Sequence, residues 1–269
     1  IYIFLYRPNK IISFGSYASF FPMLSIIILK FFFKIDVYIH EQNSVLGRTN
    51  KFYLRYSEKI FLNFELKSKI KYKFEKKIHR VGTPEKNINY SNLKKKNNKK
   101  FTIFISGGSQ GSEYISNFAI QLIKNINKDN IIKAKFILQS PTNLISKIRD
   151  NLYNIRSELV IRDYYNNLDE IMSISSVAIS RAGAGTINDL INFKVPSVLI
   201  PLPSSKDNHQ FYNASILTQN EVAIFLDQNK NEINKAKNFI YQIYNKSVDI
   251  KSIKNKFNKI KVKNSNSLI

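Results

Sequence analysis

The segment from Phe101 to Ile123, FTIFISGGSQGSEYISNFAIQLI, decides the fold class. Its apolar run Phe101–Ser106 leads straight into the glycine loop Gly107–Gly111, and apolar residues then recur on one face of a helical pattern. A strand, a glycine loop and a helix in this order leave backbone N–H groups and the positive end of a helix available to an anion. An ordinary tight turn explains the same glycines, because glycine is common in such turns.

The rest of the chain repeats this alternation of strand and helix. Further strands are predicted at Lys10–Phe14, Ile35–Asn43, Glu58–Phe64, Lys77–Pro84, Lys133–Ser140, Glu158–Tyr164, Ser176–Ser180, Pro196–Leu202 and Val222–Asp227. Helices are predicted at Phe20–Phe33, Gly47–Ser57, Glu113–Lys124, Asn143–Tyr153, Gly185–Ile191 and Asn208–Thr218, with two amphipathic helices between Asn231 and Lys261. Strands that alternate with helices in this way predict an α/β fold with parallel sheets covered on both faces.

A polar, charged stretch from Glu85 to Lys100 separates two α/β halves and predicts a domain boundary. We expect a first domain over residues 1–90, a second over 91–245, and a C-terminal helix within 246–269 that can pack back on the first domain. The chain begins Ile1-Tyr2-Ile3 without Met, so we expect the first domain to be incomplete at its N-terminus.

The composition excludes several kinds of metal site. The absence of cysteine excludes disulfides and thiolate ligands. The histidines, His40, His79 and His209, are too far apart for a zinc pattern. No Asp-x-Asp pair occurs, which removes one usual way of holding a metal against a nucleotide diphosphate. We therefore expect neither a metal nor a cofactor.

The formal net charge of +23 is compatible with nucleic-acid binding. Lys, Asn and Ile are abundant together and the lysines are scattered, which the codon use of an AT-rich genome also explains. No platform of stacking aromatic residues and no recognition motif accompanies the charge. We favour a chain that binds no nucleic acid and whose basic surface helps it to dock on anionic lipid.

The most apolar segment is Phe20–Phe33, FFPMLSIIILKFFF. Pro22 and Lys30 bound an apolar stretch that is too short to span a bilayer. We therefore expect a buried helix of an α/β domain here and not a membrane anchor.

Two further loops follow predicted strands, where ligands bind in open α/β sheets. In Ile179–Leu190, Thr186 is a candidate helix cap, and Asp189 either favours the helix dipole or accepts the hydroxyls of a ribose. In Ile200–Ala214, a polar helix start suits a sugar-binding rim as well as an ordinary cap. Its polar residues are Asp207, Asn208, His209, Gln210 and Asn213.

The motifs HEQN, GGSQGS, SRAGAGT and KDNHQFYNA, in this order and spacing, resemble the MurG family of transferases. The resemblance covers nearly the whole chain. It implies the GT-B architecture, two Rossmann-like domains that face each other across a cleft. It also implies inverting transfer of N-acetylglucosamine from UDP-GlcNAc to undecaprenyl-pyrophosphoryl-MurNAc-pentapeptide in peptidoglycan synthesis. Such an enzyme would bind peripherally at the cytoplasmic face of the bacterial inner membrane, through apolar and basic surface.

The resemblance also implies the residues that bind substrate. Ser109 would face the diphosphate with its neighbours Gly107, Gly108 and Gln110, while Tyr165 would line the uracil pocket. The nucleotide would be wrapped by Ala184, Gly185, Thr186, Ile187, Asn188 and Asp189, with Asp189 on the ribose in place of the usual Glu.

Further implied contacts come from three other motifs. Gln210 would contact the sugar, with His209 standing where a second Gln is common. Asn43 would reach the donor sugar from the first domain. Lys86 replaces the Arg of a GNPxR motif, so a bidentate phosphate contact is lost there.

The catalytic base is not assigned within this sequence. The family's glycine-rich first loop and its candidate base histidine would lie upstream of Ile1, and Glu41 is more plausibly structural than a substitute. Two alternatives therefore stay open: a UDP-sugar-binding half without transfer activity, and another UDP-sugar transferase of the same fold.

Overall fold

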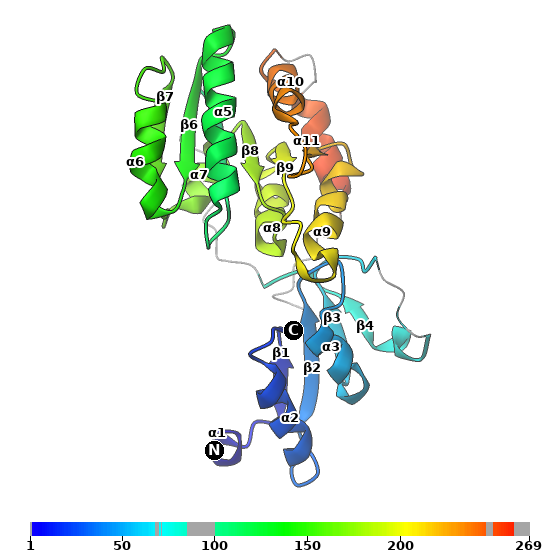
Figure 1. Cartoon of the computed structure of the whole chain (residues 1–269). Helices are drawn as coiled ribbons and strands as arrows, with labels where there is room; N and C mark the ends of the chain where they lie inside the picture. The colour runs from blue at the N-terminus through cyan, green and yellow to red at the C-terminus, as the bar shows by residue number, and fades with distance from the viewer. Residues whose placement is uncertain (1, 68–69, 71, 85–99, 246–249, 261–269) are drawn as a thin grey trace. The chain divides into compact units, whose positions relative to one another are not determined.

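The computed structural model describes residues 2–67, 70, 72–84, 100–245 and 250–260 (Figure 1). By internal contacts the chain divides into two compact units, the first within Ile1–Lys86 and the second within Asn87–Ile260. The predicted domain boundary near residue 90 falls in 85–99, outside the described residues. Helix α11 (Ile250–Lys259) belongs to the second unit.

The first unit is a parallel sheet in the order β1-β2-β3-β4. Val37, Ile39 and Ile60 are completely buried, as expected for central strands with apolar side chains on both faces. Its elements are α1 (Tyr2–Tyr6), β1 (Lys10–Ser13), α2 (Phe20–Leu29), β2 (Asp36–Glu41), α3 (Arg48–Tyr53), β3 (Lys59–Leu62) and β4 (Ile78–Arg80), with 3-10 turns at Leu54–Tyr56 and Tyr72–Lys77.

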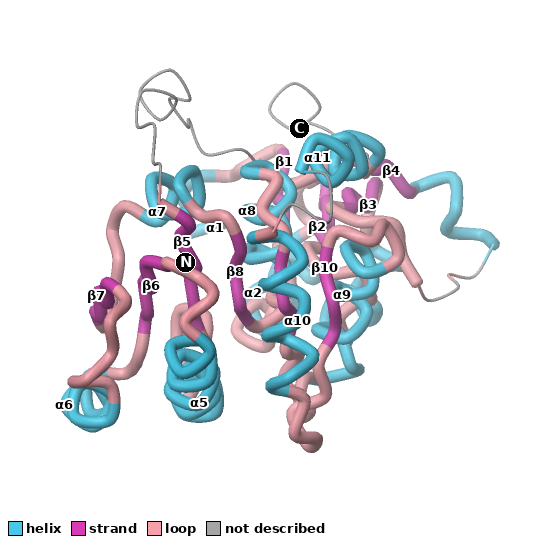
Figure 2. Tube along the Cα trace, turned by 90° about the horizontal axis from the view of Figure 1, so that it is seen from above, coloured by secondary structure: helices cyan, strands magenta, loops and turns pink. Residues whose placement is uncertain are grey.

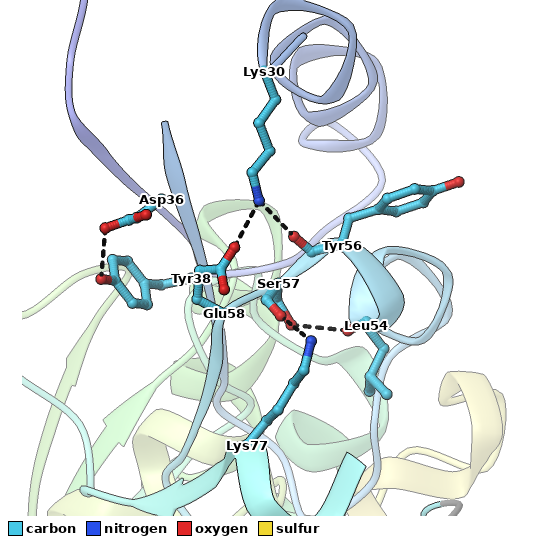
Figure 3. A network of polar contacts seen from close by, with 8 residues as sticks. All are labelled: Lys30, Asp36, Tyr38, Leu54, Tyr56, Ser57, Glu58 and Lys77. Carbon is cyan, nitrogen blue, oxygen red and sulfur yellow. Dashed lines mark hydrogen bonds and ion pairs between the residues drawn. The ribbon is translucent and has the colours of Figure 1, made fainter. Parts of the chain in front are cut away.

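A polar network fixes the end of α2 to the start of β3, at the edge opposite the HEQN motif (Figure 3). Lys30 Nζ lies 2.7 Å from Glu58 Oε1 and donates to the Tyr56 carbonyl oxygen at 3.4 Å. The hydrogen bond from Lys30 is the main reason that the pKa of Glu58 is lowered. Lys77 Nζ donates to the carbonyl oxygen of Ser57 in the same turn.

The second unit is a parallel sheet in the order β10-β9-β8-β5-β6-β7. Its strands are β5 (Phe101–Ser106), β6 (Ala134–Gln139), β7 (Glu158–Arg162), β8 (Val177–Ser180), β9 (Ser197–Leu199) and β10 (Ala223–Phe225). Its helices are α5 (Glu113–Asp129), α6 (Thr142–Asn151), α7 (Leu168–Ile174), α8 (Ala184–Phe193), α9 (His209–Thr218), α10 (Ile233–Tyr244) and α11, with a 3-10 turn at Lys206–Asn208.

The strand order of the second unit reverses between β5 and β8. The chain runs from β5 outward through β6 and β7, then crosses back to β8 on the other side of β5. Figure 2 shows α5 and α6 on one side of these strands and α7 on the other, as right-handed crossovers require. A ligand crevice is expected at such a reversal, beyond the carboxyl ends of the strands.

The α/β class and the predicted order of strands and helices are confirmed. One predicted helix was too short, and two helices, α1 and α7, were not predicted. The helix after the glycine loop is longer than expected and ends at Asp129, followed by Asn130 as a C-cap in the left-handed conformation. Helix α7 was not predicted, because its seven residues are too few to show a clear period.

The prediction of a buried helix at Phe20–Phe33 was wrong for most of its apolar side chains. The helix covers the sheet with one face only, and its buried residues are Met23 and Ile26. Phe21, Phe31 and Phe32 are 65%, 85% and 77% exposed. Among the described helices, none is long and apolar enough to cross a membrane.

Candidate functional site

The loop between β5 and α5 can be built only with glycine at several positions. Gly108 and Gly111 have φ of +86° and +70°, a region that side chains disfavour. A Cβ on Gly107 would lie 2.5 Å from the backbone nitrogen of Ser112. The glycines therefore do more than make a tight turn, because they let the loop fold closely against the start of α5.

Two backbone N–H groups of this loop have no acceptor among the described residues. The N–H of Gly108 donates to Ser106 Oγ at 3.1 Å, and that of Gly111 donates to the Gly108 carbonyl oxygen at 3.0 Å. The N–H groups of Ser109 and Gln110, both exposed residues, have no acceptor among the described residues. Backbone donors beside a helix N-terminus form an anion-binding arrangement.

The start of α8 offers a second set of donors. Its N-cap residue is Gly183, which has no side chain to cap the helix, so the prediction that Thr186 is the cap was wrong. The first hydrogen bond of the helix runs from the N–H of Ile187 to the Gly183 carbonyl oxygen at 3.0 Å. The N–H groups of Ala184, Gly185 and Thr186 therefore lack an acceptor in the described part of the chain.

Asp189 lies in the second turn of α8, whose first turn holds no acidic residue. A helix dipole acts mainly on charges in the first turn. The dipole explanation for Asp189 is therefore weak, and the ribose interpretation stays a prediction. Of its predicted neighbours, Ile187 and Asn188 are buried residues of α8, and their contact with a nucleotide stays a prediction.

Arg181, directly after β8, forms hydrogen bonds that connect these loops. Only 6% of the residue is exposed. Its Nη1 donates to the carbonyl oxygens of Ile200 and Pro201 at 2.9 and 3.3 Å, and its Nη2 donates to Ser112 Oγ at 3.0 Å. Ser112 is the N-cap residue of α5. One guanidinium thus connects the ends of β8 and β9 with the glycine loop.

Gln210 performs a similar connection from α9. Its Oε1 accepts hydrogen bonds from the N–H groups of Ala182 at 3.3 Å and Leu202 at 3.0 Å. The carbonyl end of this side chain therefore orders two loops, and the predicted contact of Gln210 with the sugar stays a prediction. His209 is held by a hydrogen bond of 2.8 Å between its Nδ1 and the Lys206 carbonyl oxygen.

Tyr165 lies in the core and not in an open pocket. It is 7% exposed, its ring meets Phe104 edge-to-face, and its hydroxyl is within 3.5 Å of the Leu138 carbonyl oxygen. Burial raises the pKa of Tyr165 to about 12. Its side chain packs within the core of the second unit, and the predicted contact with uracil stays a prediction.

In the first unit, the carboxylate of Glu41 in the HEQN motif already accepts several hydrogen bonds. Glu41, 3% exposed, accepts from Asn43 N–H at 3.0 Å and Asn43 Nδ2 at 3.2 Å. It also accepts from Gly47 N–H at 2.9 Å and Asn50 Nδ2 at 2.8 Å. The expectation that Glu41 is structural is confirmed. Asn43 lies in this network, and Lys86 lies outside the described residues.

Within the second unit, the fold brings together the glycine loop, the start of α8 and Gln210. Sequence reasoning missed Arg181, which connects them. The available signal was a charged residue directly after the buried strand Val177–Ser180, since a charge at such a position needs compensating contacts.

Comparisons with known proteins identify the family of the chain. The glycosyltransferase family 28 C-terminal domain matches residues 102–268. A Rickettsia canadensis protein named UDP-N-acetylglucosamine--N-acetylmuramyl-(pentapeptide) pyrophosphoryl-undecaprenol N-acetylglucosamine transferase is 34% identical over 229 residues. The match covers 83% of this chain and 63% of that relative, so the chain spans less than two thirds of the relative's length.

Two solved structures show the fold. MurG of Acinetobacter baumannii is 20% identical with a TM-score of 0.73, over 98% of this chain and 73% of that one. The spinosyn rhamnosyltransferase SpnG, solved with thymidine diphosphate, is 12% identical with a TM-score of 0.63, over 99% and 73%. The predicted fold class, that of the GT-B glycosyltransferases, is thereby confirmed.

Proposed function

The chain belongs to glycosyltransferase family 28, and from this premise we propose that it transfers N-acetylglucosamine from UDP-GlcNAc to undecaprenyl-pyrophosphoryl-MurNAc-pentapeptide. The name of the Rickettsia canadensis relative supports this choice of donor and acceptor. The reaction would convert one lipid-linked precursor of peptidoglycan into the next.

The observation that carries the proposal is the pair of open donor sets at the strand reversal of the second unit. Ser109 and Gln110 present N–H groups from the glycine loop, and Ala184 and Gly185 present them from the uncapped start of α8. Two neighbouring groups of N–H donors suit the two phosphates of a nucleotide diphosphate.

The chemistry is an inverting displacement at the anomeric carbon. A hydroxyl of the muramoyl sugar attacks C1 of N-acetylglucosamine and gives its proton to a general base, which is not assigned within this sequence. The C1–O bond to the β-phosphate breaks, and UDP leaves with the bonding electrons. The same N–H groups stabilise the charge that develops on the departing diphosphate, in the manner of an oxyanion hole. In this proposal the positive charge comes from the protein and not from a metal.

Independence from metal has a direct test. We expect UDP to bind with the same affinity in EDTA and in millimolar MgCl2. An affinity that falls more than about tenfold in EDTA, which is about 1.4 kcal/mol, would show that a metal shares the diphosphate.

Asp189 is proposed to accept hydrogen bonds from the ribose. Asp189→Ala should weaken UDP binding by about 1.5–3 kcal/mol, the usual loss for a hydrogen bond to a charged group. Asp189→Asn is the matched control, because it keeps one acceptor and the side-chain volume and should lose less. Unchanged UDP affinity in Asp189→Ala would remove Asp189 from the site.

The first unit carries the surface that we propose for docking on the inner membrane at its cytoplasmic face. Phe21, Phe31 and Phe32 are exposed on and after α2. Arg7, exposed near them, lies 5.4 Å from the centre of the Phe33 ring, and Lys34 follows in sequence. Exposed aromatic residues with cations beside them suit the interface of an anionic bilayer.

A second candidate function is UDP-sugar binding without transfer. The engaged carboxylate of Glu41 favours it, since four donors leave this group unsuited to act as a base. The two functions share the donor site and differ only in the second step.

One experiment separates them. Titration calorimetry with UDP-GlcNAc tests donor binding, and transfer of radiolabelled sugar to a lipid-pyrophosphate acceptor tests the reaction. Saturable binding with transfer supports the first function, and saturable binding without transfer supports the second. The absence of UDP-GlcNAc binding would contradict both.

A further inference from the structure

Arg181 is a buried cation with neutral partners. Its polar partners are two backbone carbonyl oxygens and the hydroxyl of Ser112, and the centre of the Tyr114 ring lies 5.6 Å from the guanidinium carbon. Among the described residues, no acidic side chain forms an ion pair with it. Burial is the main reason that the pKa of Arg181 is lowered.

Two acidic residues lie near Tyr114 and have other contacts. Burial is the main cause that raises the pKa of Tyr114, and the charges of Asp227 and Glu232 raise it further. Glu232 accepts from the N–H of Asp227 at 2.6 Å and from Lys235 Nζ at 3.2 Å. Burying a charge without a counter-ion is costly, so the chain retains an electrostatic cost here.

The guanidinium of Arg181 is connected to both loops that carry the donor groups of the candidate site. Ser112, which accepts from Arg181 Nη2, packs so closely on Gly107 that a Cβ there would lie 2.5 Å from the Ser112 nitrogen. Gly183, which starts α8, follows Arg181 by two residues. Arg181 therefore contacts the end of the glycine loop through the hydroxyl of Ser112, and it precedes the N-cap of α8 by two residues.

We propose that Arg181 is a positioning residue that fixes the glycine loop and the start of α8 in one arrangement, and that its uncompensated charge makes the site selective for diphosphate over less charged ligands. The inference rests on the proposed function in taking a uridine nucleotide as the ligand. It adds that the ligand's own phosphate acts as the counter-ion that the described residues do not supply.

This role differs measurably from that of a purely structural clip. A buried positive charge attracts a ligand in proportion to the ligand's negative charge, so its loss weakens UDP more than UMP, and UMP more than uridine. If Arg181 only ordered the loops, its loss would weaken the binding of all three ligands by the same factor. The ratio of the uridine and UDP dissociation constants therefore reports the charge alone.

The experiment measures the affinities of UDP, UMP and uridine for the full chain by NMR titration. Arg181→Gln removes the charge, Arg181→Lys keeps it without the planar fork, and Ser112→Ala removes one clip contact and keeps the cation. Arg149→Gln, at an exposed position of α6, is the control for the loss of one positive charge.

We expect Arg181→Gln to weaken UDP on the order of tenfold and uridine by less than about twofold, because only the charged ligand interacts strongly with the cation. Arg181→Lys and Ser112→Ala should weaken all ligands and keep the wild-type ratio, and Arg149→Gln should leave affinities and ratio unchanged.

Equal weakening of UDP and uridine in Arg181→Gln would overturn the inference. If Arg181→Gln does not fold, a ratio that collapses in Ser112→Ala, where the cation remains, would overturn it as well. Wild-type chain that binds no UDP would instead contradict the proposed function, so the two failures are distinguishable.

Discussion

The carboxyl ends of the strands are closed by polar contacts in the first unit and left open in the second. After β2, the carboxylate of Glu41 accepts hydrogen bonds from Asn43, Gly47 and Asn50, so its acceptor oxygens are used within the fold. After β5 and β8, N–H groups lack acceptors and Arg181 lacks a counter-ion among the described residues. The difference teaches that similar α/β units can fill the polar groups at this edge within the fold or leave donors open, and we propose that the open donors bind an anion.

Gly107→Ala should produce the largest effect on the open edge. The new Cβ would meet backbone atoms at 2.5 and 2.8 Å, so the loop must move. We expect UDP affinity to fall about 100-fold, equivalent to about 2.8 kcal/mol. Gly183→Ala is the control, because its Cβ meets only Thr186 Oγ1 at 3.9 Å. Equal UDP affinities for both variants, measured by calorimetry, would show that the loop geometry does not matter.

Glu41→Gln tests the closed edge. The amide would turn a donor toward the N–H of Gly47 or Asn50 Nδ2, which leaves buried donors without an acceptor. We expect the first unit to lose about 2 kcal/mol of unfolding free energy in urea, near the middle of the range for such groups. UDP affinity should stay as in wild type. A large loss of UDP affinity with unchanged stability would place Glu41 in a binding role instead.

Phe31 and Phe32 sharpen the comparison at the surface. Replacing both with Ser should lower partitioning onto anionic vesicles about tenfold, since each ring contributes apolar area to the interface. Stability should not fall, because both rings are already exposed. The matched control replaces Tyr153, which is 79% exposed on the second unit, with Ser. Equal vesicle binding by both variants in a flotation assay would contradict the proposed surface.

His40 predicts a smaller, pH-dependent effect in the first unit. Its Nε2 lies 2.7 Å from the Gly82 carbonyl oxygen, and burial lowers its pKa from 6.5. The unfolded chain therefore binds a proton more readily. The contribution of neutral His40 to the free energy of unfolding should be fully present above pH 6.5. It should fall as the pH drops toward the lower folded pKa, by at most about 1.4 kcal/mol per pH unit.

The control for this prediction is His40→Gln, which can still donate to the Gly82 carbonyl oxygen but does not titrate. Its stability should be flatter between pH 6.5 and the onset of carboxylate titration. A wild-type curve parallel to that of the variant in urea unfolding would contradict the assignment.

The sequence was informative where local chemistry decides the structure. The glycine loop was predicted because Gly108 and Gly111 adopt φ values that few other residues tolerate. Thr186 was misplaced as a cap because Gly183 starts the helix three residues earlier, and glycine gives a weak signal there. The exposure of Phe31 was missed because apolar residues are only on average buried.

Arg181 could not be placed from the sequence, since its role depends on tertiary contacts. Its partners Ser112 and Ile200 lie 69 and 19 residues away along the chain. The side-chain connections of Gln210 to Ala182 and Leu202 were hidden for the same reason, although its position near the site was expected from the family resemblance. The motifs predicted which loops form the candidate site, and the contacts between these loops could be seen only in the fold.

An NMR titration of the 15N-labelled chain with UDP tests the central claim most directly. The account predicts saturable shifts of the amide signals of Ser109, Gln110, Ala184 and Gly185. The N–H groups of these residues have no acceptor in the described part of the chain. Saturable binding that moves signals of the first unit and leaves these four unchanged would contradict it.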